Sequence, residues 1–260
     1  MKFLRIALTF MLVLCVSALA SAQTAEEIMA RAVEISGGEA ALRSIQTMVS
    51  TGTVTIAVQQ LEGTFVSRAM RPNMIRIDAT VMEMTVVQAT DGTATWMINP
   101  FLGTTDPMPM DEFTGAMFLR DADIDGPYLD TAAKGIVAEY VGIEEIGGEE
   151  LQCVRFTYSD GFEILHYFDI PTGLPRKVRL TLPAEMQAQE VTTTLSDYRQ
   201  VGSILAAHRI EQGVGGITTL VIQLEELEIN AEVDPAIFSM PEVEEAVEEE
   251  PAPEEPEPGV

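Results

Sequence analysis

The chain has 260 residues, of which 47% are hydrophobic, so it is long enough for one large domain or two small ones with a sizeable core. Its 41 acidic and 15 basic residues give a formal net charge of -26, which argues against nucleic acid as a partner because phosphates need a basic surface. The same charge argues against docking on an anionic membrane by charge alone. The two cysteines exclude a disulfide scaffold and a cysteine-rich zinc module.

The first 22 residues have the pattern of a secretory signal peptide. Lys2 and Arg5 form a positive segment, residues 6–16 are almost entirely apolar, and residues 20–22 have the small side chains of a cleavage site. The apolar run is shorter than a typical membrane span, and an uncleaved anchor is the alternative. We therefore expect residues 1–22 to be removed and the rest of the chain to be exported, into the periplasm if the host has two membranes.

A helix is predicted directly after this segment. Thr24 and Glu27 have the three-residue spacing of a capping box, and the glycines at 37–38 are a helix stop. One apolar face is marked by residues at helical spacing, which are Ile28, Ala32 and Ile35. Residues 39–45 are compatible with a second, shorter helical turn.

From residue 46 onward, runs rich in threonine, valine and isoleucine alternate with turn residues, which predicts strands. The turns are short, as at Asp91-Gly92, and short connections favour antiparallel neighbours. The expected strands in the first half are 47–59, 62–71, 74–80, 82–89 and 93–98. Those in the second half are 136–146, 149–158, 162–169, 176–182, 189–198, 208–213 and 217–230. About eleven strands with regular turns indicate a mainly β protein, either an up-and-down sheet or a barrel.

Two segments break this rhythm. Residues 99–134 are rich in glycine, proline and aspartate, with a candidate helix at 111–119, and a long excursion of this kind is either a functional lid or a connecting loop. Residues 242–260 contain nine glutamates and four prolines, too little apolar surface to fold, so this tail is either merely solvated or a contact for a basic partner. The predicted organisation is therefore a signal peptide at 1–22, one domain at 23–241 and an acidic, disordered tail.

The sequence contains no recognisable arrangement for catalysis or metal binding. His166 and His208 lie on predicted strands without further ligands at suitable spacing. Cys153 lies among apolar strand residues, which is typical of a core position, and the sequence has no G-x-S-x-G elbow. We therefore expect no enzyme, no metal and no cofactor, since a hydrolase would need a reactive centre.

Methionine is concentrated between residues 74 and 117. Its side chain is flexible and polarisable, so it suits an adaptable apolar cavity such as one for lipid chains, although an ordinary core has the same composition. Seven methionines lie in this part, which are Met74, Met82, Met84, Met97, Met108, Met110 and Met117.

Three stretches give the sequence a resemblance to a known family. An R-P-N turn at 71–73 is followed by D-G-T-A-T-W-M-I-N-P-F at 91–101, and the domain closes with D-P-A-I-F-S-M-P at 234–241. These stretches resemble the LolA family of periplasmic lipoprotein carriers, over roughly residues 25–241. The helix before the predicted strands matches the same family, whereas the region after Phe101 and the acidic tail depart from its pattern.

The resemblance implies an unclosed half-barrel of antiparallel strands wrapped around N-terminal and lid helices, with a concave hydrophobic cavity for acyl chains. In the family, the arginine of the R-P-N turn latches the lid through hydrogen bonds to loop backbone. This role is implied here for Arg71, with the lid at 102–125, and the planar guanidinium suits it because it presents several donors. The implied cavity and lid residues are Arg71, Trp96, Phe65, Met82, Met84, Met97, Phe101, Met110, Phe113 and Met117.

The resemblance further implies a non-catalytic periplasmic carrier that binds the acyl chains of outer-membrane lipoproteins and shuttles them between the two membranes. Its partners would be the acylated lipoprotein, an inner-membrane releasing complex and an outer-membrane acceptor. The alternative is a binder or sensor of another lipid on the same fold, because a fold does not settle the cargo.

Overall fold

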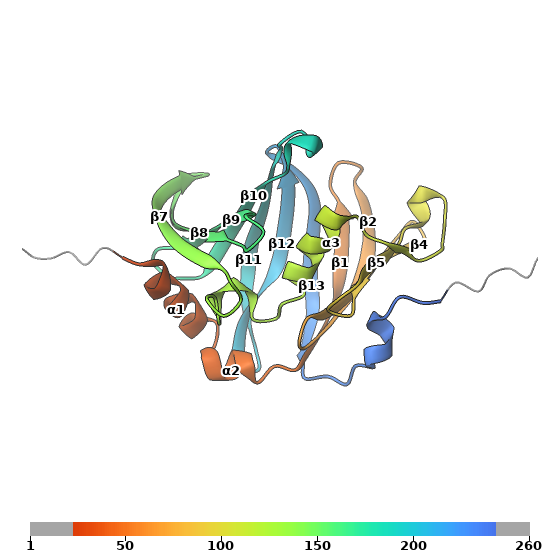
Figure 1. Ribbon diagram of the computed structural model, residues 1–260, viewed down its shortest axis with the longest axis horizontal. Helices are drawn as coiled ribbons and strands as arrows, with labels where there is room; N and C mark the ends of the chain where they lie inside the picture. Colours follow the sequence, from red (N-terminus) through yellow and green to blue (C-terminus); the bar gives the residue numbers. More distant parts are fainter. Residues whose placement is uncertain (1–22, 243–260) are drawn as a thin grey trace, which may run out of the picture.

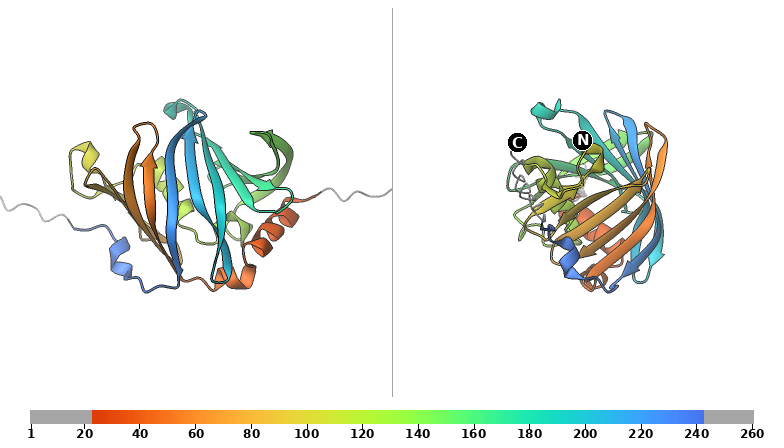
Figure 2. Two further views of the ribbon diagram at one scale, coloured as in Figure 1. Left: turned by 180° about the vertical axis from the view of Figure 1, so that it is seen from behind. Right: turned by 90° about the vertical axis from the view of Figure 1, so that its right-hand side faces the viewer.

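One long antiparallel sheet organises residues 23–242, which are the residues that the computed structural model describes (Figure 1). The predicted signal peptide and residues 243–260 of the predicted tail lie outside the described residues. Within 23–242 the sheet has thirteen strands in the order β6-β5-β4-β3-β2-β1-β13-β12-β11-β10-β9-β8-β7. Neighbouring strands follow one another in the chain, except for β1 and β13, which pair at the middle of the sheet. The sheet curves but ends at β6 and β7, so the predicted unclosed half-barrel is confirmed (Figure 2).

The strands are close to those predicted, with thirteen rather than about eleven. The first half of the chain supplies β1 (Thr47–Ile56), β2 (Leu61–Met70), β3 (Met74–Val81), β4 (Met84–Thr90), β5 (Thr95–Ile98) and β6 (Met108–Pro109). The second half supplies β7 (Val137–Ile146), β8 (Glu149–Thr157), β9 (Glu163–Asp169), β10 (Pro175–Thr181), β11 (Glu190–Val201), β12 (Ile204–Val214) and β13 (Ile217–Ile229). The strand β6 escapes prediction because two residues are too short to show a period.

Three α-helices and four short 3-10 turns complete the described part of the chain. The α-helices are α1 (Ala25–Ile35), α2 (Glu39–Arg43) and α3 (Glu112–Asp121). The 3-10 turns are η1 (Pro100–Leu102), η2 (Gly126–Tyr128), η3 (Ala184–Met186) and η4 (Pro235–Phe238). Each helix within residues 23–242 is too short or too polar to span a lipid bilayer.

The helix α1 covers one end of the concave face, next to β7, β8 and β9 (Figure 1). Its predicted capping box is present, because Thr24 and Glu27 exchange backbone-to-side-chain hydrogen bonds of 3.2 Å each. Ile28 and Ala32 are buried in a cluster with sheet residues, as expected from their spacing. Ile35 is 42% exposed and contributes nothing to this cluster, so its predicted place on the buried face is wrong.

The helix α3 crosses the middle of the concave face (Figure 1). Its predicted range is nearly right, and it begins at the N-cap Asp111, whose carboxylate accepts a hydrogen bond from the Thr114 N–H at 3.0 Å. Gly115 lets the helix approach β5 closely, since a Cβ at this position would lie 2.5 Å from Thr95 Oγ1. The sequence therefore places a small residue where the helix meets the sheet.

The closing segment folds back on the outer, convex side of the sheet, where η4 lies beside the strands of the first half (Figure 2). The Trp96 indole N–H donates a hydrogen bond of 2.8 Å to the Phe238 carbonyl, and both side chains are buried. Arg76 donates to the Ile237 carbonyl at 3.1 Å. Two of the three stretches that carry the family resemblance thus contact each other and stabilise the fold.

Candidate functional site

Two cavities lie on the concave face, one on each side of α3. The larger, of about 740 Å³, is walled mainly by β1 to β4, β12 and β13, with apolar side chains such as Val54, Phe65 and Ile222. The smaller, of about 630 Å³, is walled mainly by β9 to β12, with apolar side chains such as Leu180 and Leu195. Apolar cavities of this size are typical of sites for small molecules.

Four residues line both cavities, and they form a shared wall. Met117 and Asp121 come from α3, where a spacing of four places them on one side of the helix. Ile210 and Gln212 are two residues apart on β12, so their side chains face the same side of the sheet. The inner side of α3 therefore faces β12 at the boundary between the two cavities.

Asp121 is the acidic residue of this shared wall. Asp121 is an exposed residue, so solvent reaches its carboxyl through the cavities, but the surrounding protein desolvates this group in part and raises its pKa to about 6. Within residues 23–242 the carboxyl makes no hydrogen bond or ion pair. The neighbouring Arg120 lowers the pKa only in part, because its guanidinium pairs with Asp160 and lies 4.7 Å from the ring centre of Tyr158.

His166 lies in the wall of the smaller cavity and is only 8% exposed. Its Nδ1 is 2.7 Å from the Tyr128 hydroxyl, and its ring contacts Phe156. Burial lowers the pKa of His166 to about 3, so the imidazole is neutral at physiological pH. Among residues 23–242, no three or more histidine, cysteine, aspartate or glutamate side chains are grouped to hold a metal ion.

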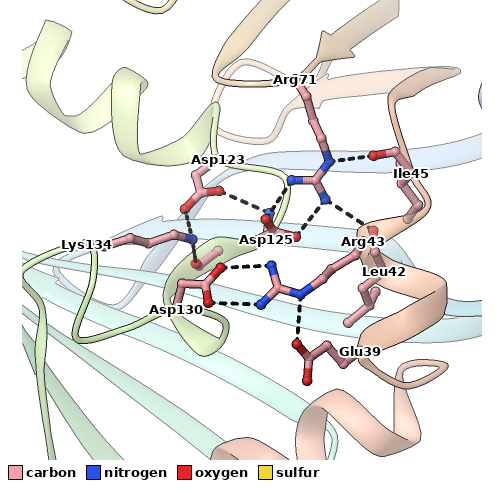
Figure 3. A network of polar contacts seen from close by, with 10 residues as sticks. Glu39, Leu42, Arg43, Ile45, Arg71, Asp123, Asp125, Asp130 and Lys134 are labelled. Carbon is pink, nitrogen blue, oxygen red and sulfur yellow. Dashed lines mark hydrogen bonds and ion pairs between the residues drawn. The ribbon is translucent and has the colours of Figure 1, made fainter.

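Arg71 connects three segments below the end of α3 (Figure 3). Its two terminal nitrogens bind the Asp125 carboxylate at 2.6 and 2.7 Å, and its Nε donates to the Ile45 carbonyl at 2.5 Å. A further bond of 3.2 Å reaches the Leu42 carbonyl. The Asp125 side chain is only 9% exposed, and the hydrogen bonds from Arg71 hold the pKa of this carboxyl below its usual range.

A second set of charged contacts surrounds this pair (Figure 3). Arg43 of α2 binds Asp130 in a two-pronged ion pair at 2.8 and 2.9 Å. Lys134 contacts the Asp123 carboxylate and donates to the Gly126 carbonyl at 2.7 Å. Arg43 and Arg71 therefore hold the segment that follows α3 to α2 and to the end of β2, and Lys134 ties this segment together internally.

Five of the predicted residues lie at this site. Phe65 and Phe101 line the larger cavity, Phe113 lines the smaller one, and Met117 lines both. Arg71 anchors the segment after α3 rather than lining a cavity. The predicted residues come together from β2, the β5–β6 connection and α3, which are distant in the chain.

The other five predicted residues line neither cavity. Trp96 lies on the convex face, because it pairs with Ala89 and contacts η4. Met82 is 61% exposed in the β3–β4 turn, where its positive φ takes it out of the strand predicted at 82–89. By their register, Met84 and Met97 face the concave side outside the two cavities. Met110 directly precedes the cap of α3, and its N–H donates to Thr95.

Several site residues escaped prediction. The cavity wall of β13 follows a simple alternation through Leu220, Ile222 and Leu224, which is a visible signal for one buried face. Asp121 and Asp125 lie within the segment interpreted as lid or loop, where aspartates occur at irregular spacing. No sequence pattern distinguishes these two from their neighbours.

No family model matches the sequence, and no curated protein matches it either. Solved structures do match. A LolA superfamily protein from Nitrosomonas europaea has a TM-score of 0.55 and 15% identity, covering 84% of this chain and 98% of that one. A domain of a candidate outer membrane lipoprotein-sorting protein from Vibrio parahaemolyticus has a TM-score of 0.51 and 12% identity, covering 81% and 97%.

A third similar structure is a DUF1329 family protein from Desulfovibrio piger, with a TM-score of 0.53 and 10% identity, covering 84% of this chain and 98% of that one. The coverage is nearly complete for all three structures, so the likeness extends over the whole sheet and not one motif. The described part of the chain therefore has a LolA-like fold, as its motifs predicted.

Proposed function

We propose that the concave groove binds lipid acyl chains, and that the protein is a non-catalytic periplasmic carrier of lipoprotein acyl chains. The observation that carries this proposal is the pair of apolar cavities on the two sides of α3. Each buried methylene contributes about 0.8 kcal/mol, so one long chain gains on the order of 10 kcal/mol. Binding cargo of this kind requires no reactive residue, only an apolar groove and a means of releasing the chain.

The same proposal makes residues 102–125 the lid of the groove, with α3 as its main part. Arg71 and Asp125 hold the end of this lid in the closed position. A closed empty state lowers the net affinity for cargo, because part of the binding energy is used to open it. Release of the cargo at an acceptor then costs less free energy than the buried apolar area alone would imply.

The likeness in fold to a candidate outer membrane lipoprotein-sorting protein supports this choice of cargo. The inner-membrane releasing complex and the outer-membrane acceptor belong to the same proposal. A binder or sensor of a free lipid would use the same groove, and the identity of the bound molecule distinguishes the two.

The decisive experiment is a native mass spectrum of the protein purified gently from envelope extract. A bound lipidated polypeptide supports the lipoprotein carrier, and a bound lipid of low mass supports a lipid binder or sensor. If neither is bound and added fatty alcohols do not bind, the groove is not a lipid site.

A matched pair of variants locates the binding. Ala79 lines the larger cavity, whereas Thr80 is on the opposite face of β3, where its hydroxyl contacts Thr85. We expect Ala79→Trp to fill the cavity and weaken lipid binding at least about tenfold, the loss of a few buried methylenes. Thr80→Trp should leave binding unchanged, and equal effects of both variants would contradict the location.

A further inference from the structure

The polar side chains of the wall shared by the two cavities restrict which lipids can bind in the groove. Gln212 and Asp121 are exposed residues that line both cavities, and within residues 23–242 neither side chain makes a hydrogen bond to another protein group. The other polar groups around Asp121 already have partners. Arg120 pairs with Asp160, and Asp123 pairs with Lys134.

Two further titratable groups face this region from the sheet. His166 of β9 is neutral and contacts the Tyr128 hydroxyl. Tyr158, at the end of β8, is covered by the Arg120 guanidinium, and burial raises the pKa of Tyr158 to about 12, so it is also neutral. Asp121 is therefore the charged acceptor that the wall leaves open to a ligand.

The position of Asp121 costs stability. A carboxylate at the last residue of a helix opposes the helix dipole, and the apolar side chains of the cavities desolvate its charge in part. Residues that break local rules without compensation in the fold are expected at functional sites. Solvent hydrogen-bonds this exposed carboxyl in the empty groove, so a lipid that displaces the solvent must donate a hydrogen bond in its place.

We propose that the groove selects a two-chain lipid, with one chain on each side of α3 and a hydroxyl or amide donor near the branch point that binds Asp121. The inference rests on the proposed function. Two chains are favoured because two cavities of similar size flank the residue. An uncharged donor is favoured over an ammonium, because burying a second ion is costly and Arg120 already supplies positive charge nearby.

The test compares two probes that differ in one donor. The first is 1,2-dipalmitoylglycerol, which has a free hydroxyl beside its branch point, and the second is its 3-O-methyl ether, which has none. Hexadecanol serves as a single-chain probe. Competition is measured by native mass spectrometry at neutral pH, and we expect the wild-type protein to prefer the free hydroxyl about tenfold or more.

Variants at Asp121 assign this preference to its carboxyl. Asp121→Leu should abolish the preference, and Asp121→Asn should reduce it to about threefold, the difference between a charged and a neutral hydrogen bond. Glu112→Gln removes the same charge from the exposed first turn of α3 and should keep the full preference. Thermal unfolding of each variant shows that it is folded.

Equal binding of the two diacyl probes to the wild-type protein would overturn the inference. So would a preference that survives in Asp121→Leu. Binding of hexadecanol with no competition from either diacyl probe would also overturn it while leaving the proposed function intact. If no probe binds, both the inference and the proposed function are wrong.

Discussion

Arg71 joins the end of β2 to two other segments through four hydrogen bonds, two of them to one carboxylate. We predict that Arg71→Leu lowers the free energy of unfolding by about 2–3 kcal/mol, because Asp125 and two carbonyls lose a charged donor. Hydrogen exchange of residues 112–125 should become faster. If the latch opposes binding, lipid release from this variant should also be slower.

The matched control is Arg68→Leu, since Arg68 lies near the end of β2, three residues before Arg71, and pairs with Asp78 on the outer side of the sheet. This variant should change neither hydrogen exchange at 112–125 nor lipid release. Hydrogen exchange that is unaffected in Arg71→Leu would show that α3 is held by its apolar contacts alone.

At the scale of single residues, the sequence singled out Arg71 and Trp96 but not the positions at which each of them makes its contacts. Arg71 was predicted through its family motif, but its partner Asp125 was not. A charged pair between residues more than fifty positions apart leaves no periodicity, and any of several aspartates in this acidic chain could have been the partner. Trp96 was predicted for the same reason as Arg71, but its motif reflects contact with η4 and not with the groove.

Phe238 is the fully buried side chain of the η4 turn, which Trp96 and Arg76 also contact through hydrogen bonds. We predict that Phe238→Ala costs about 3–5 kcal/mol, which is typical of a buried phenylalanine. Trp96 is the one tryptophan of the chain, so its fluorescence reports on this contact, and the emission should shift to longer wavelength as η4 detaches. Lipid binding should survive at temperatures where the variant is folded, since the contact is on the convex side.

Among the elements, the hairpin strands and α3 were predicted well because each has a period and a turn signal of its own. The strand β12 begins earlier than predicted, at Ile204, because Ala206 and Ala207 have weak strand preference and only pairing with β11 makes them extended. The β3–β4 turn was misplaced because a residue with strand character lies in a turn. Met82 resembles a strand residue, yet it adopts the positive φ that the tight turn requires.

For the whole molecule, two groups oppose each other in their effect on stability between about pH 4 and 6. The pKa of His166 is lowered to about 3 from an ordinary 6.5, so the unfolded chain binds its proton more tightly and stability falls as the pH drops through this range. The pKa of Asp121 is raised to about 6 from an ordinary 3.8, so the folded chain binds its proton more tightly and stability falls as the pH rises.

We therefore predict that Asp121→Asn makes the protein more sensitive to acid. Without the opposing carboxyl, the free energy of unfolding should fall by up to about 1.4 kcal/mol per pH unit on acidification from pH 6 to 4, the slope of one proton. The measurement is urea unfolding at a series of pH values. The double variant with His166→Phe should lose this slope, and a slope that persists would assign it to other groups.

The architecture as a whole was predictable from the sequence only through the family resemblance. Strand periodicity alone left an up-and-down sheet and a closed barrel both open. In the structure β6 and β7 are edge strands that do not pair, and the segment between them forms α3 and the charged contacts of Asp125 and Asp130. Contacts of this kind depend on three-dimensional packing and have no linear signature.

The pairing of β1 with β13 also sets the point in chain synthesis at which the sheet can be completed. Met48 pairs with Ile229, so the middle of the sheet joins the first strand of the domain to be synthesised with the last. Hairpins on either side can form as the chain grows, but this junction must wait, since contacts between distant residues form slowly and need both partners present. A chain emerging amino end first therefore has no complete groove until β13 has appeared. A truncation before β13 removes the centre of the sheet rather than its edge.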